Sequence, residues 1–458
     1  MTTAKENSEK IAKKAVVIGS GLGGLLTAAN LLKDGWDVEV YERLALIGGR
    51  FTNIEYKGYK LSTGALHMIP HGAKGPLATM LKELDATVEI IQSDPLAIVR
   101  MPKNIEDKTY KNGFEDISHL DFKKHLTFKN KLIMAGLTFG FKTGLSRPGK
   151  IGFKTWYSKY LHDDRIDRCA DSFTGWALST MSDEVSTEEV FGILSNVLKY
   201  GGPGIVVGGC LSITKELVRI ISEAGGHIYT NTEITKIIVK DGKAIGVIAN
   251  GKEVFADLVI NDIGHKEAWN ICEFDGVASA SALPLLELTA PAYKEYAENL
   301  KEMKPSAGLK ICFASDEQLL PEGCTLMLTP YANRINGLNE VTNADPNLAP
   351  PGKHLVMCHQ RTALDKLSEP DLNTEIELGL EDVRDLFPGK NIEILVVQVH
   401  SGGWPVNRAF SGTDIGNQTP VPNLIVVGDG AKGEGGIEIE GITFGVQNAL
   451  KLIQKRTS

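Results

Sequence analysis

The stretch VVIGSGLGGLLTAANLLKDGWDVEVYER, from Val16 to Arg43, decides how the chain begins to fold. Its apolar start is typical of a short buried strand, and LLTAANLLKDG has apolar residues at helical spacing, ended by Gly35. DVEVYE alternates like a second strand and ends in Glu42. The turn between the first strand and the helix contains three glycines, Gly19, Gly21 and Gly24. The stretch therefore predicts a βαβ unit with a glycine-rich turn.

A βαβ unit of this kind is the fingerprint of a dinucleotide-binding domain. Gly19 permits the tight turn, Gly21 lets the backbone reach a pyrophosphate, and Gly24 lets the helix pack on the strand. The helix N-terminus offers free N–H groups to the phosphates. Glu42 can accept hydrogen bonds from ribose hydroxyls but would repel a 2′-phosphate, which disfavours NADP. The alternative is a glycine turn in a cofactor-free α/β domain, but strand, helix, second strand and acid occur here together.

A second glycine run, LIVVGDGAKGEGG from Leu424 to Gly436, repeats the G-x-G-x-x-G spacing near the end of the chain. It follows an apolar strand, but a helix over roughly 441–454 uses most of the residues that remain. No second strand and no acidic ribose ligand can follow, so the context of the motif is wrong. The sequence therefore predicts no second dinucleotide here, and Asp429 needs another explanation.

The residues after Glu42 carry a family resemblance. Arg43 is followed at once by LALIGGRF and then by the hairpin-like stretch NIEYKGYKLSTGALHMI. This order resembles the FAD-binding opening of the flavoprotein superfamily of amine oxidases and bacterial-type phytoene desaturases, and it is closest to the phytoene desaturase-like branch (carotenoid and retinoid oxidoreductases). In that superfamily the G-G-R segment lies along the pyrophosphate, and the Gly-Ala pair lies near the flavin ring. The resemblance implies FAD as the cofactor.

The second glycine run resembles the closing motif of the same family. There the aspartate after the last strand bonds the ribityl or phosphate portion of FAD, and the following helix points at the flavin. We therefore expect one FAD, held from both ends of the chain. The cofactor-binding residues that the resemblance implies are Gly19, Gly21, Leu22, Gly23, Gly24, Glu42, Arg43, Gly49, Arg50, Gly64, Ala65, Ile234, Gly428, Asp429, Gly441 and Ile442.

The middle of the chain contains two hairpin signals, Asp241-Gly242 and Asn250-Gly251, between alternating apolar runs. They predict a three-stranded meander that leads into the strand ADLVI. Family members place such a meander on the FAD domain, where backbone at Glu233-Ile234 meets the adenine. The preceding Gly208-Gly209 opens a helix that either packs behind the cofactor, as in relatives, or simply begins there.

The expected fold class is α/β, with a Rossmann-like FAD-binding domain (a parallel sheet plus a β-meander) and a mixed α+β substrate domain. The FAD-binding domain is discontinuous over 1–91, 201–264 and 392–458, and the substrate domain takes 92–200, mainly helical, and 265–391. The second insertion contains the strand-like runs GLKICFAS and HLVMCHQRT, then a helix through Glu381. Carotenoid desaturases usually close with Thr-His-Pro-Gly, where this chain has DGAKGE. FAD binding is still expected with this different segment, but the resemblance does not imply a carotenoid substrate.

The stretch between Asp121 and Asp163 is basic. It holds no acid and nine Lys or Arg, namely Lys123, Lys124, Lys129, Lys131, Lys142, Arg147, Lys150, Lys154 and Lys159. Aromatic residues alternate with these charges, namely Phe139, Phe141, Phe153, Trp156 and Tyr157. The pattern is typical of a segment that faces an anionic membrane surface. The alternative is a solvated helical face whose apolar side packs on the protein's own core.

Composition excludes several classes of protein. The net charge of −8 over 458 residues gives no nucleic-acid signature. No run of about 20 apolar residues predicts a transmembrane helix, and MTTAKENSEK lacks the apolar core of a signal peptide. The six cysteines are scattered without a C-x-x-C pair, so we expect no metal site and no disulfide framework. These features fit a cytoplasmic protein, either free or bound peripherally to a membrane.

Histidines supply the one candidate for a catalytic side chain. His67 and His71 follow Gly64-Ala65 closely, and His67 is the better candidate because it lies nearer to that pair. His265 and His400 are weaker candidates. No Ser/His/Asp order and no H-E-x-x-H pattern supports a hydrolase or a metalloenzyme.

The resemblance implies hydride transfer between an apolar substrate, of isoprenoid or polyene type, and the flavin. A desaturase, a saturase, an isomerase and an amine oxidase would share nearly the same sequence features. A non-catalytic prenyl or lipid carrier of the GDP-dissociation-inhibitor-like branch is a further alternative. Glu42, Arg50 and Asp429 argue against it, since a carrier needs no polar ligands for FAD. The electron acceptor is expected to be a quinone, oxygen or a protein partner, because no separate NAD site is visible.

Overall fold

The structure is a computed structural model that describes residues 12–65, 67–145 and 149–457. The stretch MTTAKENSEK and Arg147 of the basic run lie outside these ranges. A five-stranded sheet joins the two ends of the chain, with the strand order β21-β13-β1-β2-β9 and parallel pairing throughout. Its strands are β1 (Lys14–Ile18), β2 (Asp37–Tyr41), β9 (His227–Tyr229), β13 (Leu258–Asn261) and β21 (Leu424–Val426).

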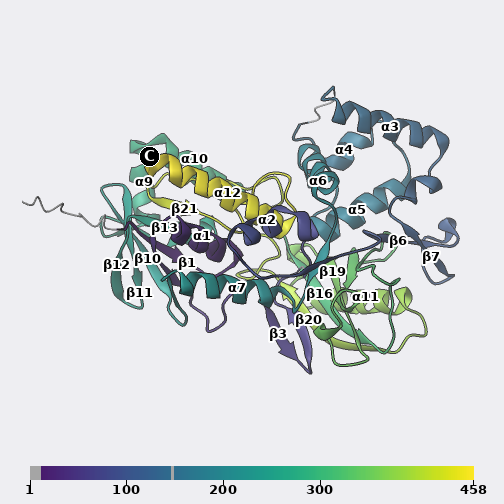
Figure 1. Cartoon of the computed structure of the whole chain (residues 1–458). Coiled ribbons are helices and arrows are strands. Elements are labelled where there is room, and N and C mark those ends of the chain that lie inside the picture. The colour runs from purple at the N-terminus through teal and green to yellow at the C-terminus, as the bar shows by residue number, and fades with distance from the viewer. Residues whose placement is uncertain (1–11, 66, 146–148, 458) are drawn as a thin grey trace, which may run out of the picture.

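Four helices cover one face of this parallel sheet, namely α1 (Leu22–Lys33), α2 (Pro76–Glu83), α7 (Cys210–Glu223) and α12 (Glu438–Thr457). Alternate residues of β1 face opposite sides, as the pleat of a strand requires. Ala15 and Val17 pack in the cluster with these helices, whereas Val16 and Ile18 pack on the other face. Figure 1 shows α1, α7 and α12 around the sheet. The βαβ unit predicted from Val16 to Arg43 is confirmed.

The predicted meander covers the other face of the parallel sheet. It consists of β10 (Ile234–Lys240), β11 (Lys243–Ala249) and β12 (Lys252–Phe255), paired antiparallel in that order. At the first hairpin, φ is 50° at Asp241 and 73° at Gly242, which is the conformation that Asp-Gly favours in a two-residue turn. β14 (Cys272–Phe274) and β15 (Val277–Ala278) extend the same sheet, and α8 (His265–Asn270), α9 (Ser279–Thr289) and α10 (Pro291–Glu302) pack beside it.

A seven-stranded sheet forms the second domain, in the order β20-β16-β19-β18-β17-β6-β7. Its strands are β6 (Ile98–Pro102), β7 (Phe114–Ser118), β16 (Gly308–Ser315), β17 (Leu326–Leu328), β18 (Gly337–Glu340), β19 (His354–Arg361) and β20 (Ile392–His400). Helix α11 (Asp371–Leu386) packs on one face through Val383 and Leu386. Helix α5 (Asp164–Leu178) packs on the other face through Trp176 and Leu178. The two strand-like runs and the helix predicted in the second insertion are confirmed.

The domain boundaries predicted from the sequence remain a prediction, and two segments pair across them. β20 begins at Ile392, the predicted start of the last FAD-binding segment, yet it pairs with β16 in the seven-stranded sheet. β14 lies in the predicted substrate domain, yet it pairs with β10 of the meander. Both strands lie close to a boundary, and each one pairs with the sheet whose free edge it reaches.

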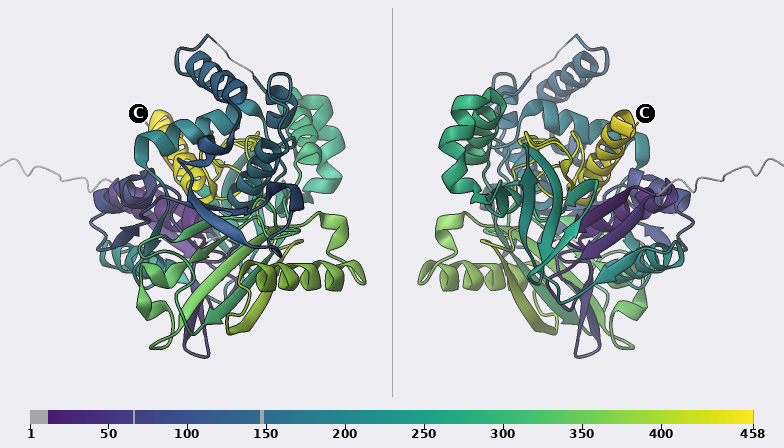
Figure 2. Two further views of the ribbon diagram at one scale, coloured as in Figure 1. Left: turned by 90° about the vertical axis from the view of Figure 1, so that its right-hand side faces the viewer. Right: turned by 90° about the vertical axis from the view of Figure 1, so that its left-hand side faces the viewer.

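The helical part of the first insertion contains α3 (Phe128–Lys142), α4 (Phe153–Tyr157), α5 and α6 (Thr187–Tyr200). It lies beside the seven-stranded sheet, on the side away from α11 (Figures 1 and 2). The expectation that its aromatic residues face a membrane is wrong for Trp156 and Tyr157, which are buried. Phe141 and Phe153 pack against the same cluster, because the Phe141 ring stacks on Phe191 of α6 and the Phe153 ring meets Phe191 edge-on. The basic run is thus partly a core segment.

Short strands complete the fold. The hairpin that follows the first βαβ unit is formed, as predicted, by β3 (Asn53–Tyr56) and β4 (Tyr59–Ser62). β5 (Ile90–Gln92) pairs with β8 (Gly204–Val206) just before α7. No described helix has the length and apolar character needed to cross a membrane.

Candidate functional site

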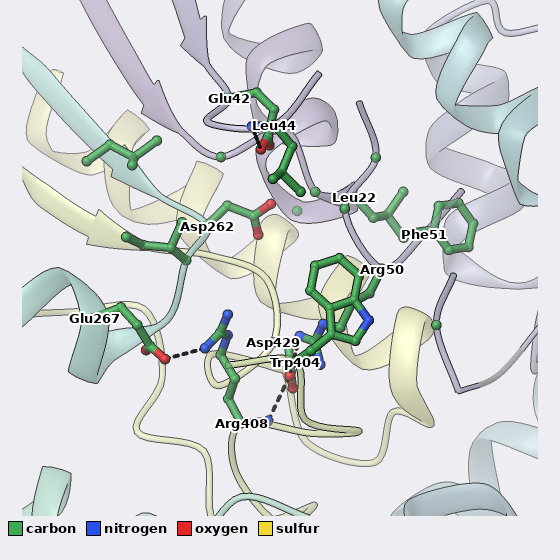
Figure 3. A pocket seen from close by; sticks show the side chains of 18 of the residues that line it. Leu22, Glu42, Leu44, Arg50, Phe51, Asp262, Glu267, Trp404, Arg408 and Asp429 are labelled. Carbon is green, nitrogen blue, oxygen red and sulfur yellow. Dashed lines mark hydrogen bonds and ion pairs between the residues drawn. The ribbon is translucent and has the colours of Figure 1, made fainter. Parts of the chain in front are cut away.

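A cavity of about 490 Å³ opens at the carboxyl ends of the parallel strands (Figure 3). Segments from both ends of the chain line it, together with the start of β10 and the loop before β21. Thirteen of the sixteen cofactor-binding residues predicted from the sequence lie on its wall, namely Gly19, Gly21, Leu22, Gly23, Glu42, Arg43, Gly49, Arg50, Gly64, Ala65, Ile234, Asp429 and Ile442.

 The other three, Gly24, Gly428 and Gly441, do not line the cavity.

The glycine turn forms one wall of the cavity and leaves no room for side chains. Gly19 has φ +93°, a conformation that favours glycine, and its N–H donates to the Tyr41 carbonyl at 2.8 Å. A Cβ on Gly24 would overlap the Gly19 carbonyl oxygen, so Gly24 serves helix packing, as predicted. Gly21 is the N-cap of α1, and no side chain caps this helix. The first N–H groups of α1 therefore have no acceptor within the helix, and this helix N-terminus favours an anion.

Glu42 lies buried at the end of β2, beside the glycine turn. Its carboxylate accepts hydrogen bonds from the Ser20 N–H at 3.0 Å and the Ser20 hydroxyl at 2.8 Å. A third bond comes from the Leu44 N–H at 2.9 Å. These bonds hold the carboxylate at the wall, where it retains acceptor capacity for a ribose hydroxyl.

Arg50 and Asp429 join the two ends of the chain inside the cavity. The Arg50 guanidinium donates to Asp429 Oδ2 at 2.6 Å, and the Arg408 N–H donates to the same oxygen at 2.7 Å. Lys432 donates to Asp429 Oδ1 at 3.0 Å. Burial alone would raise the pKa of Asp429, but Lys432 and Arg50 hold it below its usual value. Protein groups thus occupy much of the acceptor capacity of Asp429, which fixes Arg50 in place.

Gly64 and Ala65 line the cavity at the other end, next to Trp404, whose indole N–H donates to the Thr63 carbonyl at 3.4 Å. A buried lysine of the seven-stranded sheet holds this segment. The Lys310 ammonium donates to the carbonyls of Ser62 and Gly64, both at 2.5 Å, and to the Ser62 hydroxyl at 2.7 Å. Burial lowers the pKa of Lys310 to about 8.

His67, the predicted catalytic residue, is buried and does not line the cavity. Burial, together with the charge of Lys310 and the neighbouring His359, holds the pKa of His67 well below its usual value. The ring is therefore neutral near pH 7. His67 belongs to a buried polar group of residues behind the Gly64 segment, and its catalytic role remains a prediction.

Three residues of the site were missed in the sequence. Asp262 follows β13 directly, Arg408 precedes the second glycine run, and Lys310 stands alone in an apolar strand. The position of Asp262 could have been recognised, because Asp429 also follows a buried parallel strand and was singled out for that reason. A lone lysine in the buried run GLKICFAS is a similar signal, since lysine is almost never fully buried without partners.

The residues on the cavity wall fit FAD. A glycine turn with free helix N–H groups and two arginines, Arg50 and Arg408, provides donors for a diphosphate. Glu42 provides a ribose acceptor at one end, and the small Gly64-Ala65 pair leaves room for a flat ring at the other. Thr232, Glu233 and Ile234 line the wall, where the adenine is expected.

Known proteins share this architecture. A family model described as flavin containing amine oxidoreductase matches residues 22–441. The crystal structure of an oxidoreductase from Methanosarcina mazei is 48% identical, with a TM-score of 0.89, and the match covers 96% of this chain and 100% of that one. An uncharacterized protein of Methanocaldococcus jannaschii is 38% identical, over 95% of this chain and 98% of its own length.

A phytoene desaturase (neurosporene-forming) of Cereibacter sphaeroides is 29% identical, over 56% of this chain and 54% of its own length. The family match spans both glycine runs, and the cavity contains the residues that such a cofactor requires. The chain therefore belongs to the flavin-containing amine oxidoreductase family, and the protein is an FAD-dependent oxidoreductase.

Proposed function

We propose that the protein transfers a hydride between a C–H bond of an apolar substrate, of isoprenoid or polyene type, and the flavin. The observation that carries this proposal is the single cavity wall that joins the diphosphate-binding turn, the Arg50–Asp429 pair and the Gly64-Ala65 segment. Bound FAD supplies the hydride acceptor or donor at its N5 atom. The similarity to a phytoene desaturase supports the substrate class.

The chain's own contribution is positioning. Lys310 donates one of its three hydrogen bonds to the Gly64 carbonyl. This bond fixes the position of the Gly64-Ala65 segment, which forms the wall where the flavin ring is expected. Trp404 covers the same end and donates to the Thr63 carbonyl. Hydride transfer depends on alignment at about 3–3.5 Å more than on a strong base. This requirement explains why rigid backbone segments, rather than a nucleophile and base pair, form the wall.

An amine oxidase-like activity is the second candidate, because the family model covers amine oxidoreductases. The protein is not a non-catalytic prenyl or lipid carrier, because it is an FAD-dependent oxidoreductase. The polar wall formed by Glu42, Arg50 and Asp429 is consistent with that assignment.

We further propose that apolar substrate reaches the protein from an anionic membrane through α3. Phe128 is 76% exposed, Leu132 58% and Phe139 63%. Leu132 follows Phe128 by four residues and Phe139 follows Leu132 by seven residues, so the three side chains lie on one face of the helix. The opposite face, with Ile133, Met134, Leu137 and Phe141, packs on the protein core. Exposed lysines flank the apolar face, namely Lys124, Lys129 and Lys131. Apolar side chains framed by basic ones complement an anionic lipid surface.

Two measurements test the proposed reaction. Lipids extracted from the purified protein and identified by mass spectrometry should contain an isoprenoid or polyene. Anaerobic addition of that compound should then change the visible absorbance of the flavin, because the flavin gains or loses a hydride. If primary amines bleach the flavin and the extracted lipid does not, the amine oxidase assignment is correct and the isoprenoid assignment is wrong.

A further inference from the structure

Asp262 points into the cavity on the side of the glycine turn (Figure 3). A Cβ on Gly21 would overlap Asp262 Oδ2, and a Cβ on Gly428 would overlap Asp262 Oδ1. A Cβ on Gly23 would lie 2.7 Å from Oδ1, and one on Gly24 would lie 3.1 Å from Oδ2. The two carboxyl oxygens therefore lie between the N-terminus of α1 and the second glycine run, in the space that glycine residues keep open.

The charged groups around Asp262 come from every segment that packs against it. The N–H of Gly24 and the guanidinium groups of Arg408 and Arg50 favour the carboxylate, whereas Glu42 opposes it. Oδ2 is buried and has no hydrogen-bond partner. Arg408 pairs with Glu267 across the cavity. Burial is the largest effect and raises the pKa of Asp262 to about 7. In the cofactor-free protein, Asp262 therefore changes its charge near neutral pH.

A bound diphosphate changes this balance. Two more negative charges at the same helix N-terminus would repel an ionised carboxylate in a buried space, where charge interactions are strong. A neutral carboxylic acid avoids this repulsion. It can also act as a hydrogen-bond donor, because its O–H can donate to a phosphate oxygen. The unpartnered Oδ2 can carry that proton.

We propose that Asp262 binds the FAD diphosphate as a neutral acid, so that FAD binding takes up one proton and weakens as the pH rises. This inference rests on the assignment of the cavity to FAD. In the cofactor-free protein, an ionised Asp262 occupies the anion site of α1 as an internal competitor for the diphosphate. Protonation of Asp262 removes the negative charge that competes with the diphosphate. It also gives the carboxyl group an O–H that can donate to a phosphate oxygen.

The direction of the pH effect follows from linkage. The diphosphate raises the pKa of Asp262 above its cofactor-free value of about 7. Below both pKa values the group is protonated in both states, and affinity for FAD does not depend on pH through this group. Between the two pKa values, the Kd rises by about tenfold per pH unit.

The test uses the full chain with FAD removed and FAD itself as the probe. Flavin fluorescence gives the Kd at several pH values between about 6 and 9, and calorimetry in two buffers of different ionisation enthalpy counts the protons taken up. The wild type should show a Kd that rises by about tenfold per pH unit above about pH 7.5, with about one proton taken up. Asp262→Asn, which keeps a neutral donor, should bind FAD with no such rise. Glu440→Gln changes another buried carboxyl, whose pKa is raised to about 7 but which does not line the cavity, and this variant should keep the wild-type pH dependence.

The number of protons taken up when the wild type binds FAD tests the role of Asp262 without any variant. A Kd that is flat across this pH range with no proton uptake would overturn the role of Asp262 while leaving FAD binding intact. The same slope in Asp262→Asn as in the wild type would also overturn it, since another group would then be titrating. Absence of FAD binding at every pH would instead overturn the assignment of the cavity itself.

Discussion

Arg50 and Asp429 come from opposite ends of the chain and meet in an ion pair of 2.6 Å inside the cavity. Asp429 is nearly inaccessible to solvent and has two further donors, the Arg408 N–H and Lys432. Buried charges of this kind need all their partners, because a charge left unpaired is costly. Asp429 thus acts on FAD largely by holding Arg50 and the second glycine run in place.

Asp429→Ala should weaken FAD binding by loosening Arg50. A hydrogen bond to a charged group contributes roughly 1.5–3 kcal/mol, so the Kd for FAD should rise about ten- to a hundredfold. Fluorescence titration of the apoprotein measures this change. The matched control is Asp414→Asn, which also removes a carboxylate near Lys432, at 3.9 Å, but does not line the cavity. Equal affinity in Asp429→Ala and the wild type would show that the ion pair does not support the site.

The roles of Lys310 and Asp262 could not be predicted from the sequence, because both depend on contacts between segments that are distant in the chain. The spacing of Gly19, Gly21 and Gly24 carries its own context, because strand, turn and helix are contiguous. Lys310 gains its meaning only when β16 lies against the Gly64 segment, more than two hundred residues away in sequence. Asp262 likewise becomes a site residue only when β13 is inserted between β1 and β21.

At the scale of elements, α3 is the clearest departure from ordinary packing. The sequence predicted a basic, aromatic surface, and the structure divides that stretch into two parts. Trp156 and Tyr157 of α4 are buried, and Lys154 lies 3.5 Å from Asp167 and 3.9 Å from Asp171. Helix α3 instead presents an apolar stripe to the surface. The alternation of charges and rings in the sequence could not separate these two cases.

Reversal of the charges beside the α3 stripe should release the protein from anionic vesicles. Each lysine near such a surface contributes about 1 kcal/mol, screened over about 10 Å at moderate salt. The triple variant Lys124→Glu, Lys129→Glu and Lys131→Glu should fail to float with phosphatidylserine-containing liposomes at low salt, while keeping its FAD. The wild type should float with these vesicles, but not with neutral phosphatidylcholine vesicles.

The matched control reverses three exposed lysines in and just after α10, which packs beside the meander, namely Lys294, Lys301 and Lys304. This variant carries the same net charge and should still float. If it is released as readily as the α3 variant, net charge explains the effect and α3 is not the docking surface. If the wild type never floats, α3 has no role in lipid binding.

At the scale of the whole molecule, local patterns predicted much of the fold. The βαβ unit, the meander and its Asp-Gly turn follow from short contiguous signals. The arrangement of the sheets did not follow from such signals. β20 pairs with β16, and α8 to α10 pack against the meander through Trp269, Tyr293 and Tyr296. Such long-range pairings depend on which apolar faces meet, and a single sequence does not specify this.

The same limit applies to the number of cofactor sites. Two glycine runs of the same spacing occur in the sequence, but Gly428 packs against Gly23 in the structure, so both runs contribute to one cavity. The first run presents the N-terminus of α1, and the second positions Asp429. The central claim is therefore a single FAD, held jointly by the two ends of the chain.

Cofactor stoichiometry tests this claim most directly. FAD released from a known amount of protein should amount to one molecule per chain in the wild type. Gly21→Val places a side chain against Asp262 at the glycine turn. The variant should fold, as judged by circular dichroism and thermal melting, but should carry no FAD. Two FAD molecules per wild-type chain, or a Gly21→Val variant that keeps its flavin, would contradict a single site held from both ends.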